Sequence, residues 1–431
     1  VRHYETWTHE EASVMLLKEL FAELAGPLAQ AGLRSDSEGD DFACIGELID
    51  PPKLRLEELL ETHQLRQGWS EVIKGRTVQK AWLYEVVSNW RSGIDVDKFD
   101  YFRRDAFYLG IQRQFDHDRY LKGVKVIPDD EGVPTISPPD KDKDSLRENL
   151  MELRKMLHRA AYQHKTVKKL EAHMIDILTM MDEIVVVTGQ GGRKLRMSEA
   201  AVILDPVAYV KLTDTFIEAR LSDREDPALT QAADEYERRV VRRQLMRLVA
   251  DWDLPRLGDE GMAGASRPFP LPESGSVVAG LCEQYRACAA VLEPETPVRP
   301  VPPHELRCQV ATFHYGMGAR DPITRVLFHS TKSEATKGFR VDNDARPLRQ
   351  KIFVFWNPPE RPCCELTLRR LTLAFQRWGE HKVSAHVASE ASLMLAPSSS
   401  PVAGLKRGRR GGLRIQASCP VSPSRVPRAA A

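Results

Sequence analysis

The sequence GIDVDKFDYFRRD, at residues 93–105, predicts a helix with an unusual polar face. Side chains four residues apart share one face of a helix, so Asp97, Tyr101 and Asp105 form a single stripe. Lys98 lies beside that stripe. Two carboxylates, a phenol and an ammonium group suit a metal, a sugar hydroxyl and a phosphate better than they suit packing. The alternative is a solvated face with Lys/Asp pairs, and the spacing alone leaves both interpretations open.

A second stripe of similar chemistry occurs in RKMLHRAAYQHK, at residues 154–165. Near one helical face lie Arg154, His158, Tyr162 and Lys165, with Gln163 and His164 flanking them. Arginine offers a planar fork to phosphate oxygens, and tyrosine can stack on a base or sugar and donate a hydrogen bond. Alone, this stripe is also typical of a solvated face with one buried tyrosine. Together, the two stripes predict two walls of a nucleotide pocket.

The composition is that of an ordinary soluble globular protein. The chain has 431 residues, of which 42% are hydrophobic and 29% charged, with a net charge of +1. No apolar run reaches the roughly 18–20 residues of a membrane span, and we expect no membrane partner. The seven cysteines show no C-x-x-C spacing, which favours a reduced intracellular protein without a structural zinc site.

The patterns along the chain predict a mainly α protein with an HD-domain-like helical core, β-hairpins, a smaller α+β C-terminal module and a disordered basic tail. The expected units are a helical core at 1–252, a Pro/Gly-rich loop at 253–276, the C-terminal module at 277–384 and the tail at 385–431. Helices are expected at 8–32, 93–111, 144–183, 205–222 and 228–251, and hairpins at 123–140 and 183–197. The GQGG sequence in the second hairpin is interpreted as a turn, because it lacks the G-x-x-x-x-G-K-[ST] pattern of a phosphate loop.

Several longer segments carry a resemblance to a known family. They are WTHEEAS (7–13), KGRTVQKAWLYEVVSNWRSGIDVDKFDYFRRD (74–105), LGIQ-x-x-FD (109–116), LHRAAYQHK (157–165), YVKLTD (209–214) and YGM-x-x-x-x-PI (315–323). This set resembles the vertebrate SAM-and-HD-domain deoxynucleoside triphosphate triphosphohydrolases, over about residues 5–375. The resemblance implies hydrolysis of a dNTP to a deoxynucleoside and inorganic triphosphate, in a helical HD fold. The expected location is the nucleus, with the cytoplasm as a second location.

The resemblance also implies roles for individual residues. His9 corresponds to a catalytic histidine and Asp97 to a ligand of a divalent metal, which can be iron, zinc, manganese or magnesium. The residues that correspond to substrate contacts are Lys98, Tyr101, Asp105, Arg154, His158, Tyr162 and Gln163. Among them, Tyr162 corresponds to a steric gate, since a ring packed on the sugar leaves no room for a 2′-hydroxyl.

A third set of residues corresponds to a regulatory nucleotide site. It comprises Arg119, His164, Lys165, Arg243, Leu245 and Arg247. The resemblance implies GTP and dNTP as allosteric activators and a homo-oligomer, a dimer or tetramer, as the assembled form. The chain departs from the family at Gly123, where an aromatic residue is expected, and at Ala160, where an arginine is expected.

The metal motif of the family, a His and a His-Asp pair, is expected upstream of residue 7, so we expect an N-terminally incomplete chain with little or no turnover. His117-Asp118 is not expected to replace that motif. Two alternatives stay open: a non-catalytic subunit that modulates full-length homologues, and single-stranded RNA or DNA binding through basic residues such as KRGRRGGLR in the tail.

Overall fold

The computed structural model describes residues 7–33, 35–36, 39–223, 226–255, 262, 269–289, 291–292, 295–317, 320–331, 338–341, 348–358 and 364–395. The fold is mainly helical with small antiparallel sheets, which confirms the predicted class. The α-helices are α1 (His9–Glu23), α2 (Ala25–Gln30), α3 (Asp41–Ile49), α4 (Lys53–Glu61), α5 (Leu65–Val72), α6 (Val96–Tyr108), α7 (His117–Gly123), α8 (Lys143–Ser145), α9 (Glu152–Leu157), α10 (Lys165–Asp182), α11 (Met197–Val202), α12 (Pro206–Tyr209), α13 (Asp214–Ser222), α14 (Thr230–Tyr236), α15 (Ser274–Ala289) and α16 (Glu365–Leu395).

The strands form four separate sheets in the described part of the chain. They are β1 (Ser35–Asp36), β2 (Gly39–Asp40), β3 (Lys125–Pro128), β4 (Pro134–Ser137), β5 (Val186–Thr188), β6 (Lys194–Arg196), β7 (Arg247–Asp253), β8 (Leu306–Phe313) and β9 (Arg349–Trp356). The predicted hairpins are β3–β4 and β5–β6. Gly191 and Gly192, in the GQGG sequence, have φ angles of 63° and 79° and make the turn of the second hairpin. Among the described residues no helix is long and apolar enough to cross a membrane.

Helix α6 presents the first polar stripe because its opposite side is buried. The Asp95 carboxylate caps the helix by accepting a hydrogen bond from the Lys98 backbone N–H at 3.1 Å. Phe99, Phe102 and Ala106 are buried in a core cluster with residues of α9. This burial leaves the other face of α6 for the polar residues.

The expected helix at 144–183 is interrupted. It begins with α8, continues through a π-helical segment at Leu146–Met151, α9 and a second π-helical segment at His158–Tyr162, and resumes as α10. The break lies at His164, whose backbone is extended and whose Nδ1 accepts a hydrogen bond from the Thr166 N–H at 3.2 Å. The side-chain cap makes a new helix start, which a periodic apolar pattern does not reveal.

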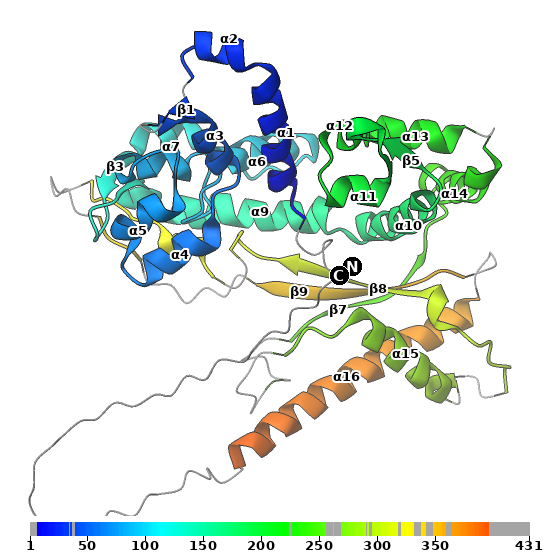
Figure 1. Ribbon diagram of the computed structural model, residues 1–431. Coiled ribbons are helices and arrows are strands. Elements are labelled where there is room, and N and C mark those ends of the chain that lie inside the picture. The colour runs from blue at the N-terminus through cyan, green and yellow to red at the C-terminus, as the bar shows by residue number, and fades with distance from the viewer. Residues whose placement is uncertain are drawn as a thin grey trace, which may run out of the picture.

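The expected helix at 228–251 is wrong beyond Val241. Helix α14 passes into a π-helical segment at Glu237–Val241, and the chain then enters β7, which pairs with β9 in a three-stranded antiparallel sheet of order β7-β9-β8. The alternation in β9 explains the pairing: Ile352, Val354 and Trp356 pack in the cluster of α15 and α16, whereas Phe353 and Phe355 pack in a cluster with Ala172 of α10. Figure 1 shows this sheet between the helical part and α15–α16.

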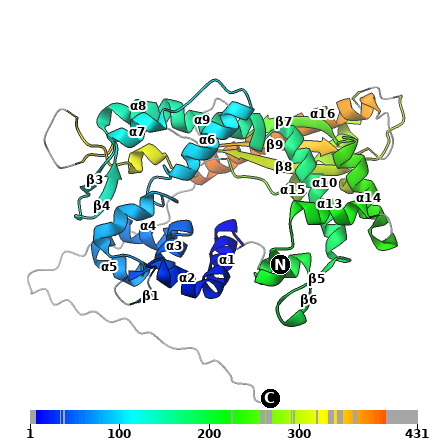
Figure 2. The ribbon, with the colours of Figure 1, turned by 90° about the horizontal axis from the view of Figure 1, so that it is seen from above.

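The two expected units share a core. Strand β7 crosses the boundary expected at residue 252, and Ile323, Val326 and Phe328 of the C-terminal half pack in the same cluster as α6 and α9. Figure 2 shows helices α1–α5 gathered on one side of α6, with α13, α14 and the β5–β6 hairpin at the other end of the molecule. The site described below lies where α6, α9 and the chain after β8 meet.

Helix α16 corrects the expected start of the tail. It continues to Leu395, so residues 385–395 are helical. Val383 and Val387 pack against the core cluster under the sheet, and the His386 ring lies 5.5 Å from that of Phe269 in a T-shaped contact. These contacts stabilise a segment whose Ser/Ala-rich composition suggested disorder. The basic sequence KRGRRGGLR and, in the loop expected at 253–276, residues 256–261 and 263–268 lie outside the described residues.

Candidate functional site

The structure brings the two predicted polar stripes together. Tyr101 and Asp105 of α6 face the helical segment that carries Arg154, His158 and Tyr162. The Tyr162 hydroxyl donates a hydrogen bond to the Asp105 carboxylate. The Tyr162 ring centroid lies 6.4 Å from that of Tyr101 and 5.1 Å from that of His158. The two walls expected from the sequence therefore form one cluster, which we call the α6–α9 cluster; it comprises Lys98, Tyr101, Asp105, Arg154, His158 and Tyr162.

Two cations lie at one end of the α6–α9 cluster. The Lys98 ammonium group pairs with the buried Asp95 carboxylate at 3.0 Å. The Arg154 guanidinium donates a hydrogen bond to the backbone carbonyl of His314, and its Nε has no hydrogen-bond partner among the described residues. Burial lowers the pKa of Arg154 and raises the pKa of Tyr101 to about 12. Partly buried cations with unused donors are suited to binding an anion.

His158 is a neutral imidazole inside the cluster. Burial, and then the charges of Arg154 and His314, lower its pKa from 6.5 to about 4. Its Nδ1 is buried and has no hydrogen-bond partner in the described part of the chain, and the same holds for Oε1 of Gln163. Buried polar atoms in native proteins usually have partners, so these two atoms indicate groups available to a ligand.

The lowered pKa of His158 predicts a pH dependence of stability. Between about pH 4 and 6.5 the unfolded chain binds a proton on this imidazole and the folded chain does not, so stability rises with pH across this window and is level above it. His173, whose pKa burial also lowers to about 4, contributes in the same direction. We expect His158→Gln to reduce the slope of the melting temperature against pH in this window. An unchanged slope would contradict a neutral buried His158.

The described residues do not fit a firmly held metal ion. Asp97 is exposed on the first turn of α6, and the described part of the chain contains no group of three His, Cys, Asp or Glu side chains arranged to hold a metal. A single carboxylate is too few ligands for a tightly bound divalent transition metal. His9 begins α1, with 82% of its side chain exposed and Glu10 at 3.2 Å. No hydrogen bond or ring contact of the described residues joins His9 to the α6–α9 cluster.

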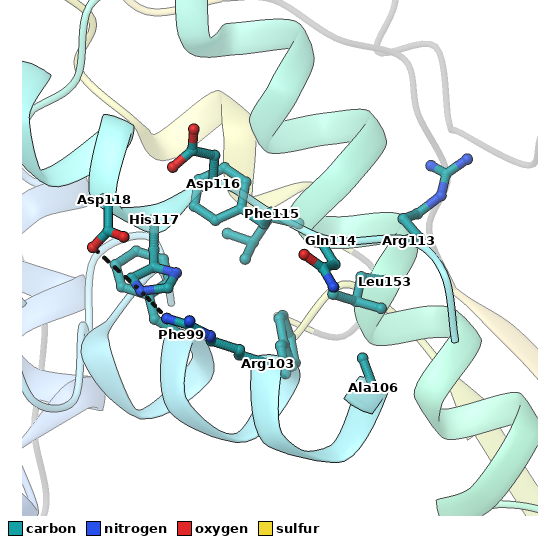
Figure 3. Close-up of a pocket in the computed structure, with 12 residues that line it drawn as sticks. Phe99, Arg103, Ala106, Arg113, Gln114, Phe115, Asp116, His117, Asp118 and Leu153 are labelled. Carbon is teal, nitrogen blue, oxygen red and sulfur yellow. Dashed lines mark hydrogen bonds and ion pairs between the residues drawn. The ribbon is translucent and has the colours of Figure 1, made fainter. Parts of the chain in front are cut away.

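His117 and Asp118 lie at the start of α7, with His117 against Phe99 and Arg103 of α6. The His117 Nε2 lies 3.2 Å from an Arg103 guanidinium nitrogen and 3.6 Å from the Asp118 carboxylate. Figure 3 shows Arg103, Gln114 and His117 around a cavity of about 340 Å³, which Phe99 also lines. Phe99 follows Asp97 by two positions, and Arg103 follows Tyr101 by two positions. Two positions are about half a turn of a helix, so these side chains point to the opposite side of α6.

The expected regulatory residues are placed in more than one location. His164 and Lys165 line a cavity of about 370 Å³ beneath the break before α10; the other lining residues are Lys155, Arg159, Gln163, Asp251, Asp253, Phe313, Arg349, Lys351 and Phe353. Arg119 forms an ion pair with Asp142 instead. Arg243, which has a φ of 55°, and Leu245 precede β7, and Arg247 is its first residue. Gln163 lines this second cavity and directly follows Tyr162 of the α6–α9 cluster in the chain.

Sequence reasoning missed three residues at the site. Asp95 holds the Lys98 ammonium group, the His314 carbonyl holds Arg154, and Gly316 lies against both cations. The sequence shows Asp95 as a possible helix cap and Gly316 as part of the YGM sequence. Neither pattern predicts a contact with Lys98 or Arg154.

Comparisons with known proteins show the family of the chain. No protein-family model matches the chain. It is 36% identical to the deoxynucleoside triphosphate triphosphohydrolase SAMHD1 of Danio rerio over 351 residues, which are 79% of this chain and 49% of that protein. The chain belongs to the SAMHD1 family. The Bos taurus SAMHD1 is 32% identical over 341 residues, 78% of this chain and 51% of that protein.

The SAMHD1 likeness extends to a protein named for its HD domain. The putative HD domain-containing protein L394 of Acanthamoeba polyphaga mimivirus is 32% identical over 156 residues, 36% of this chain and 30% of that protein. The chain spans about half the length of the curated SAMHD1 relatives described above.

Proposed function

We propose that this chain binds deoxynucleoside triphosphates as part of a deoxynucleoside triphosphate triphosphohydrolase. The observation that supports this proposal is the hydrogen bond from Tyr162 to Asp105 in the α6–α9 cluster, which has the cations Lys98 and Arg154 at one end. A carboxylate and a phenol provide an acceptor and a donor for a sugar hydroxyl, and the cations neutralise phosphate charge. The names of the SAMHD1 relatives point to the same class of substrate.

The position of Tyr162 suggests how deoxyribose is selected. Its ring is fixed by the hydrogen bond to Asp105 and by the ring contacts with Tyr101 and His158. A side chain held from three directions cannot move aside without loss of these contacts. We propose that the ring fills the space that a ribose 2′-hydroxyl requires.

Replacement of Tyr162 by alanine is expected to relax the selection of deoxyribose. We expect the wild-type chain to bind dATP more tightly than ATP by at least about 30-fold, about 2 kcal/mol, and the variant to show a ratio below about threefold. Isothermal titration calorimetry with both nucleotides measures the ratio. Tyr162→Phe is the matched control, because it keeps the ring and removes only the hydroxyl.

A steric gate predicts that Tyr162→Phe keeps most of the preference for dATP even if both nucleotides bind more weakly. Equal ratios in wild type and Tyr162→Ala would contradict the gate. A wild-type chain that binds neither nucleotide would contradict the proposed function itself.

The proposal includes at most weak hydrolysis by this chain alone. Asp97 is a single exposed carboxylate, and this observation favours a second candidate function, a nucleotide-binding subunit without turnover. Release of inorganic triphosphate from dATP, with Asp97→Ala as control, separates the two candidates. Release that depends on Asp97 would favour the enzyme, and its absence despite dATP binding would favour the subunit.

The basic cavity at His164 and Lys165 supports a further part of the proposal, binding of a regulatory GTP or dNTP. Five cationic side chains line it, and their excess over the two carboxylates Asp251 and Asp253, which pair with Lys351, suits a phosphate chain; they are Lys155, Arg159, Lys165, Arg349 and Lys351. Phe313 and Phe353 suit a base. Assembly of dimers or tetramers would follow from nucleotide binding between copies, as the family resemblance implies.

A further inference from the structure

The chain that follows β8 returns to the α6–α9 cluster as a tight turn, His314–Met317. The His314 carbonyl accepts a hydrogen bond from Arg154, and the His314 Nδ1 accepts one from the Gly316 N–H at 2.9 Å. The Tyr315 hydroxyl donates to the Glu152 carboxylate, and only 8% of Tyr315 is exposed. Since two residues in the first turn of α9, Glu152 and Arg154, hold this turn, its position relative to Arg154 is fixed.

Gly316 lies in this turn next to both cations. Its φ is 112°, a conformation that residues with an L side chain rarely adopt. A Cβ at this position would lie 3.7 Å from Cε of Lys98 and 3.8 Å from Nε of Arg154. The absence of a side chain therefore leaves a space about the size of a methyl group next to both cations. Nε of Arg154, the nearer polar atom, is buried and has no hydrogen-bond partner among the described residues.

We propose that Gly316 is a substrate-positioning residue, which leaves room for an oligophosphate oxygen between Lys98 and Arg154. The inference rests on the proposed function and deepens it, since it assigns the phosphate end of the ligand to a place in the structure. It also gives the C-terminal half of the chain a direct part in the site, as a third wall opposite α6 and α9.

A simpler explanation is that Gly316 serves only the geometry of the turn. The two explanations differ in what a methyl group at this position would do. A purely structural glycine, once replaced, weakens the binding of every ligand of the site together. A glycine that makes room for phosphate affects a ligand with a phosphate chain and spares one without it.

The test is Gly316→Ala in the full chain, with inorganic triphosphate and deoxyadenosine as separate probes. We expect the affinity for inorganic triphosphate to fall at least about tenfold, which corresponds to about 1.4 kcal/mol, and that for deoxyadenosine to change less than about twofold. Calorimetry measures the first, and ligand-observed NMR the second. Gly191→Ala is the strain control, because Gly191 also has a positive φ, 63°, and a Cβ there would meet only open space.

A double-mutant cycle makes the assignment specific. In an Arg154→Lys background, which lacks the Nε donor, the effect of Gly316→Ala on triphosphate binding is expected to shrink to less than half. Tyr315→Phe removes the hydrogen bond from Tyr315 to Glu152 and so loosens the turn without straining the backbone. It is expected to weaken triphosphate binding about threefold, about 0.65 kcal/mol.

The outcomes distinguish the two proposals. Equal losses for both probes in Gly316→Ala, or additive effects in the cycle, would overturn the role of Gly316 and leave dATP binding by the wild-type chain intact. Unchanged triphosphate binding by Gly316→Ala would overturn it as well. Failure of the wild-type chain to bind dATP would overturn the proposed function, and with it this inference.

Discussion

Arg154→Met is expected to weaken dATP binding at least about 100-fold, about 2.7 kcal/mol. Arg154 is a partly buried cation of the α6–α9 cluster, and burial lowers its pKa. A hydrogen bond between a buried guanidinium and a phosphate is roughly twice as strong as one between neutral groups, and the low local polarity strengthens it further. Methionine keeps much of the length and apolar bulk of the side chain, so the variant removes mainly the charge and the donors.

The same substitution is not expected to destabilise the fold. Arg154 interacts with the His314 backbone carbonyl and the Tyr101 hydroxyl, and no ion pair between Arg154 and a carboxylate occurs among the described residues. An apolar side chain removes the cost of burying its charge, which offsets the lost hydrogen bond. We therefore expect a melting temperature equal to or above that of the wild type, together with the loss of binding.

Arg159→Met is the matched control for Arg154→Met. Arg159 is exposed, lies about one and a half turns beyond Arg154 in the same helical run, and lines the cavity at His164 and Lys165. Each substitution removes one positive charge, so the change in net charge is identical. Calorimetric titration with dATP, over concentrations that saturate the wild-type chain, measures the affinity of both variants. Similar losses in both variants would show that the affinity comes from the overall charge of this surface, and the α6–α9 cluster would lose its place as the substrate site.

The local parts of the site could be predicted from the sequence. A helix places residues four apart on one face, so the stripe of Asp97, Tyr101 and Asp105 followed from the spacing alone. The mainly helical class and both hairpins followed from the apolar periodicity and the turn residues. The meeting of the two stripes was expected from their chemistry, and the structure places Tyr162 and Asp105 in direct contact.

Contacts between distant segments account for what the sequence did not reveal. The residues of β7 have an apolar pattern compatible with a helix, and only pairing with β9, about 100 residues later, makes them a strand. Arg154 and His314 are 160 residues apart, so no local pattern links them. At His164 a single side chain caps the start of α10 and ends the preceding helical segment. A capping residue of this kind is visible in the sequence, but the apolar pattern on both sides of it predicts one continuous helix.

Glu85→Ala is expected to lower the free energy of unfolding by about 3–5 kcal/mol, the largest effect on stability that we predict. Glu85 and Arg91 are buried, with 3% and 2% of their side chains exposed, and the Arg91 Nε donates to Glu85 at 2.9 Å. The Glu85 carboxylate also accepts hydrogen bonds from the Thr135 hydroxyl at 2.6 Å and from the Ile136 N–H at 3.0 Å. Removal of the carboxylate leaves two donors without their acceptor and Arg91 with Asp129 as its remaining carboxylate partner, at 3.2 Å.

An exposed ion pair provides the comparison for Glu85→Ala. Arg55 and Glu58 form a pair at 2.7 Å with about 60% of each side chain exposed, and Glu58→Ala is expected to cost less than about 1 kcal/mol. Urea denaturation followed by circular dichroism measures both variants. The double variant Glu85→Leu, Arg91→Leu is expected to be at least as destabilised as Glu85→Ala, because it leaves the buried Asp129 carboxylate without its cation Arg91. A cost near that of Glu58→Ala would mean that water reaches Arg91 in the folded protein.

The Glu85–Arg91 pair is connected to the α6–α9 cluster, because Arg91 belongs to the loop that precedes α6. The Asn89 side chain accepts hydrogen bonds from the backbone N–H groups of Arg91 and Ser92, and the Asn89 N–H donates to Asp95 at 3.1 Å. Asp95 in turn pairs with the Lys98 ammonium group. We therefore expect Glu85→Ala to weaken triphosphate binding at temperatures well below its melting transition, although Glu85 has no contact with the α6–α9 cluster. Unchanged binding in that variant would show that Asn89 and Asp95 hold Lys98 without help from the buried pair.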